Sequence, residues 1–160
     1  MPTRSPTGRL DKTLDMPISL ERDGGHGCRR YRCRMRCPCG TGLPYGECCE
    51  LLHLGTPAPT AERLMRSRFS AFAVNLPDYL LETWHPSTRP TELDLDSDVR
   101  WYRLDIESRE RGGMLDNGGL VTFTAWFRST DGPGSLHETS RFAREGGAWR
   151  YVDGIVDTRR

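Results

Sequence analysis

The sequence predicts an α+β fold in which two or three helices precede an antiparallel sheet of about four strands, with a small four-cysteine knuckle in front of both. Three observations predict it. Apolar residues recur at steps of three and four between residues 60 and 76, the period changes to two after about residue 99, and four of the six cysteines lie between residues 37 and 49. With 160 residues and a mass of 18.2 kDa, the chain has room for one ordinary core and a small appendage.

The cysteine cluster predicts a metal site. Structural zinc takes four donors at tetrahedral angles, and closed sites draw their thiolates from two close pairs. Here the pairs are Cys37 with Cys39, on either side of Pro38, and Cys48 with Cys49. All six cysteines fall between residues 28 and 49, which is not the spread of a disulfide framework and suits a reducing compartment.

Zinc is favoured over three alternatives, which are free thiols, a vicinal disulfide between Cys48 and Cys49, and oxidative pairs. Besides the spacing, Gly40, Gly42 and Gly46 permit the left-handed backbone that brings amides near the thiolates. Four cysteine ligands leave no open position for a reacting water, so we expect the metal to be structural. The predicted Zn²⁺ ligands are the four clustered thiols, Cys37, Cys39, Cys48 and Cys49.

Two helices are predicted after the knuckle. Thr60 is suited to cap the first helix, and Glu62 lies in its first turn, where negative charge suits the helix dipole. Pro77 suits the first turn of a second, shorter helix, and Pro86 ends it because proline disfavours helical geometry at His85. The apolar stripe of the first helix consists of Leu64, Met65, Phe69, Phe72, Ala73 and Leu76.

Four strands are predicted after the helices. The last two span residues 136–144 and 148–153, and turn signals at 116–119, 131–134 and 145–147 separate the four strands. Sequential hairpins indicate an antiparallel sheet with the helices on one face. In the first two strands, one face carries Tyr102, Leu104 and Ile106, and Val121, Phe123, Ala125 and Phe127.

Three segments differ in composition. Residues 1–36 contain Pro, Ser, Gly, Thr and Arg without a hydrophobic period, so we expect a disordered N-terminal extension. The knuckle spans 37–55, and a stiff bridge at 56–59 leads to an α+β domain over 60–157. Because Met35 stands just before the knuckle, we expect translation to begin there, and peptides from the upstream residues of the native protein would contradict this.

Charge and hydropathy limit the function classes. The 23 Lys and Arg residues nearly balance the 22 Asp and Glu residues, so no global field favours nucleic acid or an anionic membrane. No apolar run approaches the roughly 20 residues of a membrane span, and the N-terminus has no apolar signal core. We therefore expect a cytoplasmic protein without a membrane span.

The N-terminal extension leaves two interpretations open. Cys28 and Cys33 are interpreted as incidental thiols because the downstream four already satisfy tetrahedral zinc; the alternative makes them substitute ligands or a redox pair. An arginine run around Tyr31 is more typical of a solvated tail than of a nucleic-acid site, although it is suited to bind phosphates and stack on a base. Its members are Arg29, Arg30, Arg32, Arg34 and Arg36.

These segments resemble known proteins. Residues 37–49, CPCGTGLPYGECC, resemble the SEC-C motif, a metal-binding tail best known from the preprotein translocase ATPase. Downstream, LMRSRFSAF at 64–72, DYLL at 78–81, TWHPS at 83–87, SRF at 140–142 and WRYVDG at 149–154 resemble the YchJ-like family of bacterial proteins of unknown function. The resemblance covers about residues 36–154 and implies a fold similar to nuclear transport factor 2, in which helices line a curved antiparallel sheet that forms a cone with a pocket.

Such a cone can host general acid–base chemistry where a carboxylate or histidine lies in an apolar surround. The candidates form no recognisable triad, so whether the chain is an enzyme stays open. A simpler interpretation makes the aromatic residues core, His85 a hydrogen-bonded helix terminator, and Arg66 and Arg68 ion-pair partners of Glu138 or Asp153. The pocket candidates are Trp84, His85, Asp105, Trp126, Glu138, Trp149, Tyr151 and Asp153.

Three functions are compatible with the sequence. We favour a zinc-binding adaptor whose knuckle presents Leu43, Pro44 and Tyr45 to a protein partner, while the cone binds a small ligand or dimerises. The second is a small-molecule enzyme that uses the cone pocket, with structural zinc. The third is an RNA- or ribosome-associated factor that uses the knuckle and its arginines. The fold does not decide among them.

Overall fold

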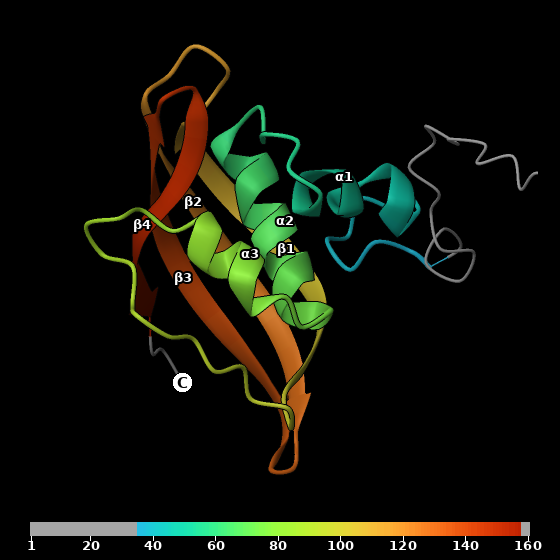
Figure 1. Ribbon diagram of the computed structural model, residues 1–160. Helices are drawn as coiled ribbons and strands as arrows, with labels where there is room; N and C mark the ends of the chain where they lie inside the picture. The colour runs from blue at the N-terminus through green and yellow to red at the C-terminus, as the bar shows by residue number, and fades with distance from the viewer. Residues whose placement is uncertain (1–34, 158–160) are drawn as a thin grey trace, which may run out of the picture.

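The computed structural model describes residues 35–157 and has the predicted α+β fold, with helices preceding a four-stranded antiparallel sheet (Figure 1). Residues 1–34 of the predicted N-terminal extension, which include Cys28, Cys33, Arg29, Arg30, Arg32 and Arg34, lie outside the described residues. The helical elements are the short 3₁₀ helix η1 (Tyr45–Glu47), α1 (Cys49–His53), α2 (Ala61–Ala73) and α3 (Pro77–Glu82). The strands are β1 (Arg100–Arg111), β2 (Gly118–Ser129), β3 (Gly132–Glu145) and β4 (Ala148–Asp157).

The helix α2 begins and ends for local reasons. Thr60 is its N-cap, as predicted, and Thr60 Oγ1 accepts a hydrogen bond from the backbone N–H of Arg63 at 3.2 Å. The helix ends at Ala73, earlier than predicted, because Asn75 adopts a left-handed backbone conformation with φ 59°. Pro77 then stands in the first turn of α3, where its fixed φ suits the helix.

The sheet is a meander in the order β1-β2-β3-β4, and every pair of neighbouring strands is antiparallel. Figure 1 shows α2 and α3 lying across one face of it, with α1 beyond α2 on the side away from the sheet. Register shifts interrupt the β1–β2 and β3–β4 ladders, and such bulges bend and twist a sheet. The strand β3 extends beyond its predicted range at both ends, and β4 extends beyond its range at the C-terminal end.

Because of a β-bulge in β1, the predicted faces of Trp101 and Tyr102 are wrong. Strict alternation placed Tyr102 with Leu104 and Ile106, and Trp101 on the opposite face. In the structure, the register shifts between Trp101 and Arg103, and Tyr102 is 49% exposed. The Trp101 ring instead packs against aromatic rings of the core. The extra residue at the bulge therefore turns Trp101 inward.

The main core lies between the helices and the sheet. Leu64, Phe69 and Leu80 from the helices pack with Val121 and Phe142 of the sheet, and all five are at most 2% exposed. Burial of this apolar area stabilises the helix–sheet arrangement. Among the described residues, no helix is long and apolar enough to span a membrane.

Segments before α2 and after α3 both hydrogen-bond to β4. After α3, the backbone N–H of His85 donates to the Tyr151 carbonyl oxygen at 2.7 Å, and the Tyr151 N–H donates to the Thr83 carbonyl oxygen at 2.9 Å. On the other side, Trp149 Nε1 donates to the Pro59 carbonyl oxygen at 3.3 Å. The bridge before α2 and the end of α3 are thus both attached to the outer strand.

Candidate metal centre

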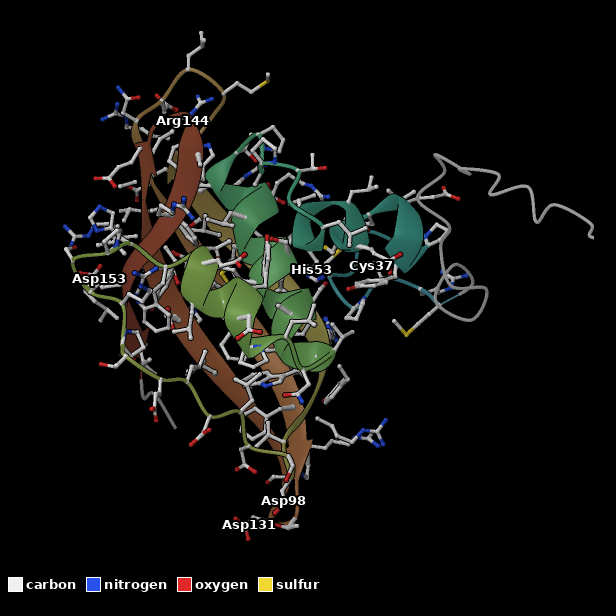
Figure 2. The ribbon with its side chains drawn as sticks, in the orientation of Figure 1. Cys37, His53, Asp98, Asp131, Arg144 and Asp153 are labelled. Carbon is white, nitrogen blue, oxygen red and sulfur yellow. The ribbon has the colours of Figure 1, made fainter. Side chains whose placement is uncertain are left out.

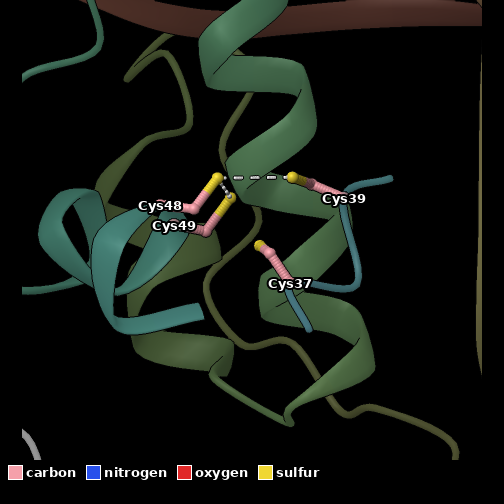
Figure 3. Close-up of side chains that lie close together, drawn as sticks. All are labelled: Cys37, Cys39, Cys48 and Cys49. Carbon is pink, nitrogen blue, oxygen red and sulfur yellow. Dashed lines mark hydrogen bonds between the residues drawn. The ribbon is translucent and has the colours of Figure 1, made fainter. Parts of the chain in front are cut away.

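Four thiols converge between the knuckle and α2 (Figure 3). Cys39 Sγ lies 3.6 Å from Cys48 Sγ, Cys48 Sγ lies 3.9 Å from Cys49 Sγ, and all four sulfurs, including that of Cys37, lie within 4.8 Å of one another. Four sulfurs about 2.3 Å from one zinc ion at tetrahedral angles would be about 3.8 Å apart. The cysteines are unbridged, which excludes the vicinal disulfide here, and their spacing fits a tetrahedral metal ion.

The thiols are buried and surrounded by hydrogen-bond donors. Cys37 is 5% exposed and the other three at most 1%. Thr41 Oγ1 lies 3.2 Å from Cys39 Sγ and 3.3 Å from Cys48 Sγ. Ser70 Oγ, from α2, lies 3.5 Å from Cys37 Sγ. Hydroxyl donors of this kind orient thiolate ligands and lessen their charge.

An arginine adds positive charge. Arg63 Nη1 donates to Cys48 Sγ at 3.5 Å. Burial by itself lowers the pKa of Arg63, but the hydrogen bond and the attraction to Cys48 outweigh it and raise this pKa above its ordinary value. Four thiolates around a divalent ion carry a net negative charge, so a guanidinium beside them stabilises the metal-bound form.

The thiols shift each other's pKa values. Hydrogen bonds from Cys37 and Cys49 lower the pKa of Cys39 well below its ordinary value of 9.0. Conversely, hydrogen bonds with Cys37 and then Cys39 raise the pKa of Cys49. The cluster thus favours one thiolate and keeps neighbouring protons, which a divalent ion would displace.

His53 connects the knuckle to α2 by hydrogen bonds. Its Nε2 lies 2.9 Å from the Ser67 carbonyl oxygen, and its Nδ1 lies 2.6 Å from Tyr45 Oη. Because a carbonyl oxygen only accepts, Nε2 carries the proton, and in the neutral ring Nδ1 accepts from the tyrosine hydroxyl. The imidazole also packs edge-on against Tyr79, with ring centroids 4.4 Å apart.

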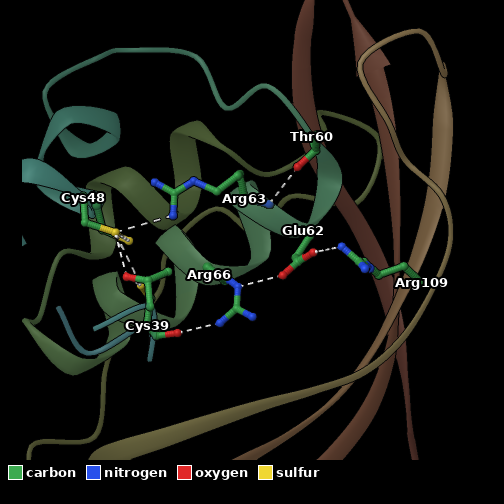
Figure 4. Close-up of polar contacts among 9 residues, drawn as sticks. Cys39, Cys48, Thr60, Glu62, Arg63, Arg66 and Arg109 are labelled. Carbon is green, nitrogen blue, oxygen red and sulfur yellow. Dashed lines mark hydrogen bonds and ion pairs between the residues drawn. The ribbon is translucent and has the colours of Figure 1, made fainter. Parts of the chain in front are cut away.

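A second connection runs from the sheet to the metal centre (Figure 4). Arg109 of β1 pairs with Glu62 of α2, whose other oxygen, Oε1, pairs with Arg66 Nε at 2.8 Å. Arg66 Nη1 then donates to the Cys39 carbonyl oxygen at 2.7 Å. This chain of three charges places one ligand residue relative to α2 and β1, although the knuckle and the α+β domain were predicted as separate segments.

The predicted partner surface needs one correction. Leu43 is 49% exposed and Pro44 is half-buried, but Tyr45 is only 1% exposed. Tyr45 packs with the cysteines and with Val74, and its hydroxyl contacts His53. Its aromatic ring serves as the small core of the knuckle, so it is not available at the surface.

The pocket candidates separate into two groups. Trp84, Glu138 and Tyr151 line one cavity between α2 and the sheet. The other five do not line it, and each has a different role. His85 pairs with Glu145 and Ser87 after α3, as a hydrogen-bonded helix terminator would, and Trp149 is buried in the core.

The remaining three candidates lie elsewhere: strand alternation turns Asp105 and Trp126 away from the cavity, and the register shift in the β3–β4 ladder does the same for Asp153. Asp105 Oδ2 accepts a hydrogen bond from Trp126 Nε1 at 2.7 Å, and neither residue lines the cavity. Asp153 pairs with Arg141 on exposed parts of β3 and β4. Figure 2 shows Asp153 at the β4 edge and Cys37 on the opposite side of the helices.

The predicted ion pairs of Arg66 and Arg68 are wrong. Arg66 pairs with Glu62, and Arg68 is 3% exposed and hydrogen-bonded to the end of α3. Two sequence signals indicate these roles: Glu62 and Arg66 are four residues apart on one helix face, and Arg68 falls on the apolar stripe. For His53 and Ser70, no such signal exists, because their contacts join segments distant in the chain.

A four-thiol knuckle packed on a helix-covered antiparallel sheet defines the class, a SEC-C motif joined to a domain similar to nuclear transport factor 2. Family models match both parts: the SEC-C motif over residues 36–51, and the middle, nuclear-transport-factor-2-like domain of YchJ over residues 60–154. The chain belongs to this YchJ-like family, whose relatives include the proteins called UPF0225.

Relatives and solved structures agree with this assignment. The UPF0225 protein of Corynebacterium glutamicum is 54% identical over 123 residues, which cover 76% of this chain and 98% of the relative. That of Streptomyces coelicolor is 52% identical over 119 residues, covering 74% and 93%. The solution structure of a SEC-C motif containing protein from Rhodopseudomonas palustris is 33% identical with a TM-score of 0.67, covering 77% of this chain and 99% of that one.

Proposed function

We propose that this chain is a cytoplasmic zinc-binding adaptor, in which structural zinc shapes the knuckle and the knuckle binds a protein partner. The observation that carries the proposal is the set of four buried sulfurs within 4.8 Å of one another. Four thiolates complete a tetrahedral zinc site, and their burial leaves no position for substrate or reacting water. A knuckle of this size has a small core of its own, so metal binding would supply much of its folding free energy.

Native mass spectrometry tests the metal. We expect one zinc per chain in protein purified under reducing conditions, and its loss from the Cys49→Ser variant. Thr41→Ser is the matched control, because it keeps the hydroxyl beside Cys39 and Cys48 and should keep the zinc. Protein that contains no metal, or a Cys49→Ser variant that retains zinc with unchanged affinity, would contradict the proposal.

An exposed apolar surface supports the partner role. The knuckle surface, defined here as Leu43, Leu51 and Leu54, has side chains 49%, 47% and 66% exposed. Leu51 and Leu54 are three residues apart, at α1 and its C-cap, so they lie on one side of that short helix. Exposed apolar side chains on so small a segment favour contact with an apolar segment of another protein.

Affinity capture with paired variants tests the partner. Leu51→Ser with Leu54→Ser removes apolar area from the knuckle surface and should release a partner that the unaltered chain retains. Met114→Ser with Leu115→Ser is the matched control, because these side chains are 68% and 98% exposed in the β1–β2 connection. Equal capture by both double variants would contradict contact through the knuckle.

Two other functions are kept as alternatives. A small-molecule enzyme is supported by Glu138, a carboxylate that lines the cavity. An RNA- or ribosome-associated factor would rest on the arginine run, of which only Arg36 lies within the described residues. Salt-sensitive ribosome association that disappears when Arg32, Arg34 and Arg36 are neutralised would favour this last alternative.

A further inference from the structure

A cavity of about 120 Å³ lies between α2 and the sheet, apart from the metal centre. Aromatic side chains form much of its wall, among them Phe69, Phe72, Trp101 and Phe123. Arg68 and Glu138 line the same cavity, together with Ser140 and Tyr151. A mostly apolar enclosure that contains a few fixed polar groups is the usual form of a small-molecule site.

Arg68 brings free hydrogen-bond donors to this cavity. Two hydrogen bonds, each 2.7 Å long, leave from its Nη1, one to the Leu80 carbonyl oxygen and one to Thr83 Oγ1. In the part of the chain that the structure describes, no hydrogen bond leaves from Nε or Nη2, and no carboxylate oxygen lies within 4.0 Å of the guanidinium nitrogens. The guanidinium is therefore held in place while part of it stays available.

The charge of Arg68 has aromatic neighbours and no anionic partner in contact. Its Cζ lies 5.2 Å from the ring centre of Trp84 and 4.6 Å from that of Tyr151. Burial lowers the pKa of Arg68 to about 10, so the side chain is still a cation at neutral pH. Trp84 Nε1 is also buried, with no hydrogen-bond partner among the described residues. A donor left unpaired in a buried place is costly, and an acceptor atom of a ligand would satisfy it.

Glu138 supplies an acceptor in the same cavity. Its Oε1 accepts hydrogen bonds from Ser140 Oγ at 2.6 Å and from Tyr151 Oη at 3.2 Å. A Cβ atom at Gly154 would lie 1.9 Å from this oxygen, so the glycine on β4 makes room for the carboxylate. Its Oε2 has no hydrogen bond in the described part of the chain. One carboxylate oxygen is thus fixed and the other is free to accept.

We propose that this cavity binds a small aromatic carboxylic acid that also carries a hydroxyl group. The ligand carboxylate would accept from the free donors of Arg68, and its hydroxyl would donate to Glu138 Oε2. An apolar cavity of about 150 Å³ holds one benzene ring in another protein, and this cavity of about 120 Å³ is smaller and partly open to solvent, so it limits the ligand to a single ring. This inference goes beyond the adaptor function, because no metal ligand lines the cavity.

Titration of the full, zinc-loaded chain with defined probes tests the inference. The probes are 3-hydroxybenzoate and 4-hydroxybenzoate, with benzoate and phenol as partial ligands. Trp84 and Trp101 line the cavity, so tryptophan fluorescence reports binding, and calorimetry gives the affinity. We expect saturable binding of at least one hydroxybenzoate, about tenfold tighter than benzoate or phenol, since each partial ligand lacks one hydrogen bond to a charged group.

Two variants connect binding to this cavity. Glu138→Gln removes the charge at similar shape and should reduce the preference for the hydroxybenzoate over benzoate about fivefold. Glu107→Gln is its matched control, because Glu107 does not line the cavity and pairs with Thr124 and His137. Arg68→Gln is not used, because it also removes the hydrogen bonds of Arg68 to the end of α3 and so destabilises the fold. The second variant is Ala125→Leu, whose larger side chain fills the cavity from β2 and should abolish binding.

The outcomes separate this inference from the proposed function. Zinc content is measured on the same samples, so absent metal with intact hydroxybenzoate binding would contradict only the adaptor. No saturable binding of either hydroxybenzoate, or equal affinity for phenol, would overturn the ligand assignment. Unchanged binding by a folded Ala125→Leu variant, with folding checked by circular dichroism, would overturn the location.

Discussion

Glu62 shows how a single side chain connects three parts of this molecule. Its carboxylate accepts from Arg66 on its own helix and from Arg109 of the sheet, and Arg66 extends the connection to the Cys39 carbonyl oxygen. Burial would raise the pKa of Glu62, but the hydrogen bonds and charges of Arg66 and Arg109 outweigh it and lower this pKa below its ordinary value of 4.5. The ionised form is therefore the one that stabilises the fold.

A pH series checks this carboxylate. A folded-state pKa below the unfolded one contributes stability above pH 4.5, and the contribution is lost as the pH falls through the folded pKa. We expect Glu62→Gln to lower the free energy of unfolding by about 1 to 2 kcal/mol at neutral pH and by much less near pH 3, measured by urea denaturation. The exposed Glu92→Gln should change it by at most about 0.5 kcal/mol, and a pH-independent loss in Glu62→Gln would contradict the assignment.

At the scale of elements, local sequence signals determine where the helices and strands lie in the chain. Tertiary contacts determine how the helices pack on the sheet. Thr60 and Pro77 begin the two helices where their chemistry predicts. The bulge that turns Trp101 inward has no comparable local signal, because the period of β1 reads as regular on either side of it. The connection of α2 to the sheet depends on a close approach between Ala61 and Gly112, whose backbone atoms hydrogen-bond at 2.9 Å.

The N-cap of α2 gives one prediction at this scale. Thr60→Ala removes the acceptor of the Arg63 N–H and should lower the free energy of unfolding by about 1 kcal/mol, measured by thermal or urea denaturation. Thr60→Ser keeps the hydroxyl and should lose much less. Equal losses in the two variants would show that the methyl group, not the cap, matters.

The close approach of Gly112 to α2 gives a second prediction at the scale of elements. Gly112 has φ 79°, and an added Cβ would lie 2.8 Å from Ala61 Cβ, so Gly112→Ala carries both backbone strain and a clash. Gly147→Ala is the matched control, because Gly147 has φ 83° and open space around it. We expect Gly112→Ala to lower the free energy of unfolding by about 1 to 3 kcal/mol more than Gly147→Ala. Equal effects in denaturation would mean that the helix can move aside.

At the scale of the whole molecule, the knuckle and the sheet domain act on one helix. The knuckle contacts α2 through His53 and Arg66, and the sheet contacts the same helix through Glu62 and the apolar core. A change in the metal centre should therefore reach α2. Two segments joined only by the bridge at 56–59 would not transmit such a change.

Metal removal tests this coupling. We expect a chelator to lower the midpoint of thermal unfolding by about 10 °C, since losing about 3 kcal/mol of ligand stabilisation has roughly that effect in a chain of this size. Hydrogen exchange should become faster in α1 and also in α2. Faster exchange confined to the knuckle would show that the two parts are independent.

The sequence by itself determined the order of helices and strands, the four clustered thiols and the resemblance to the YchJ-like family, because periodicity, caps and spacing are local properties. Only the tertiary structure decided that Tyr45 is buried, that Arg68 and Glu138 face one cavity, and that Asp105, Trp126 and Asp153 lie away from it. The physical reason is that strand register and helix packing select which side chains meet, and one bulge or one crossing contact changes that selection without any mark in the local pattern.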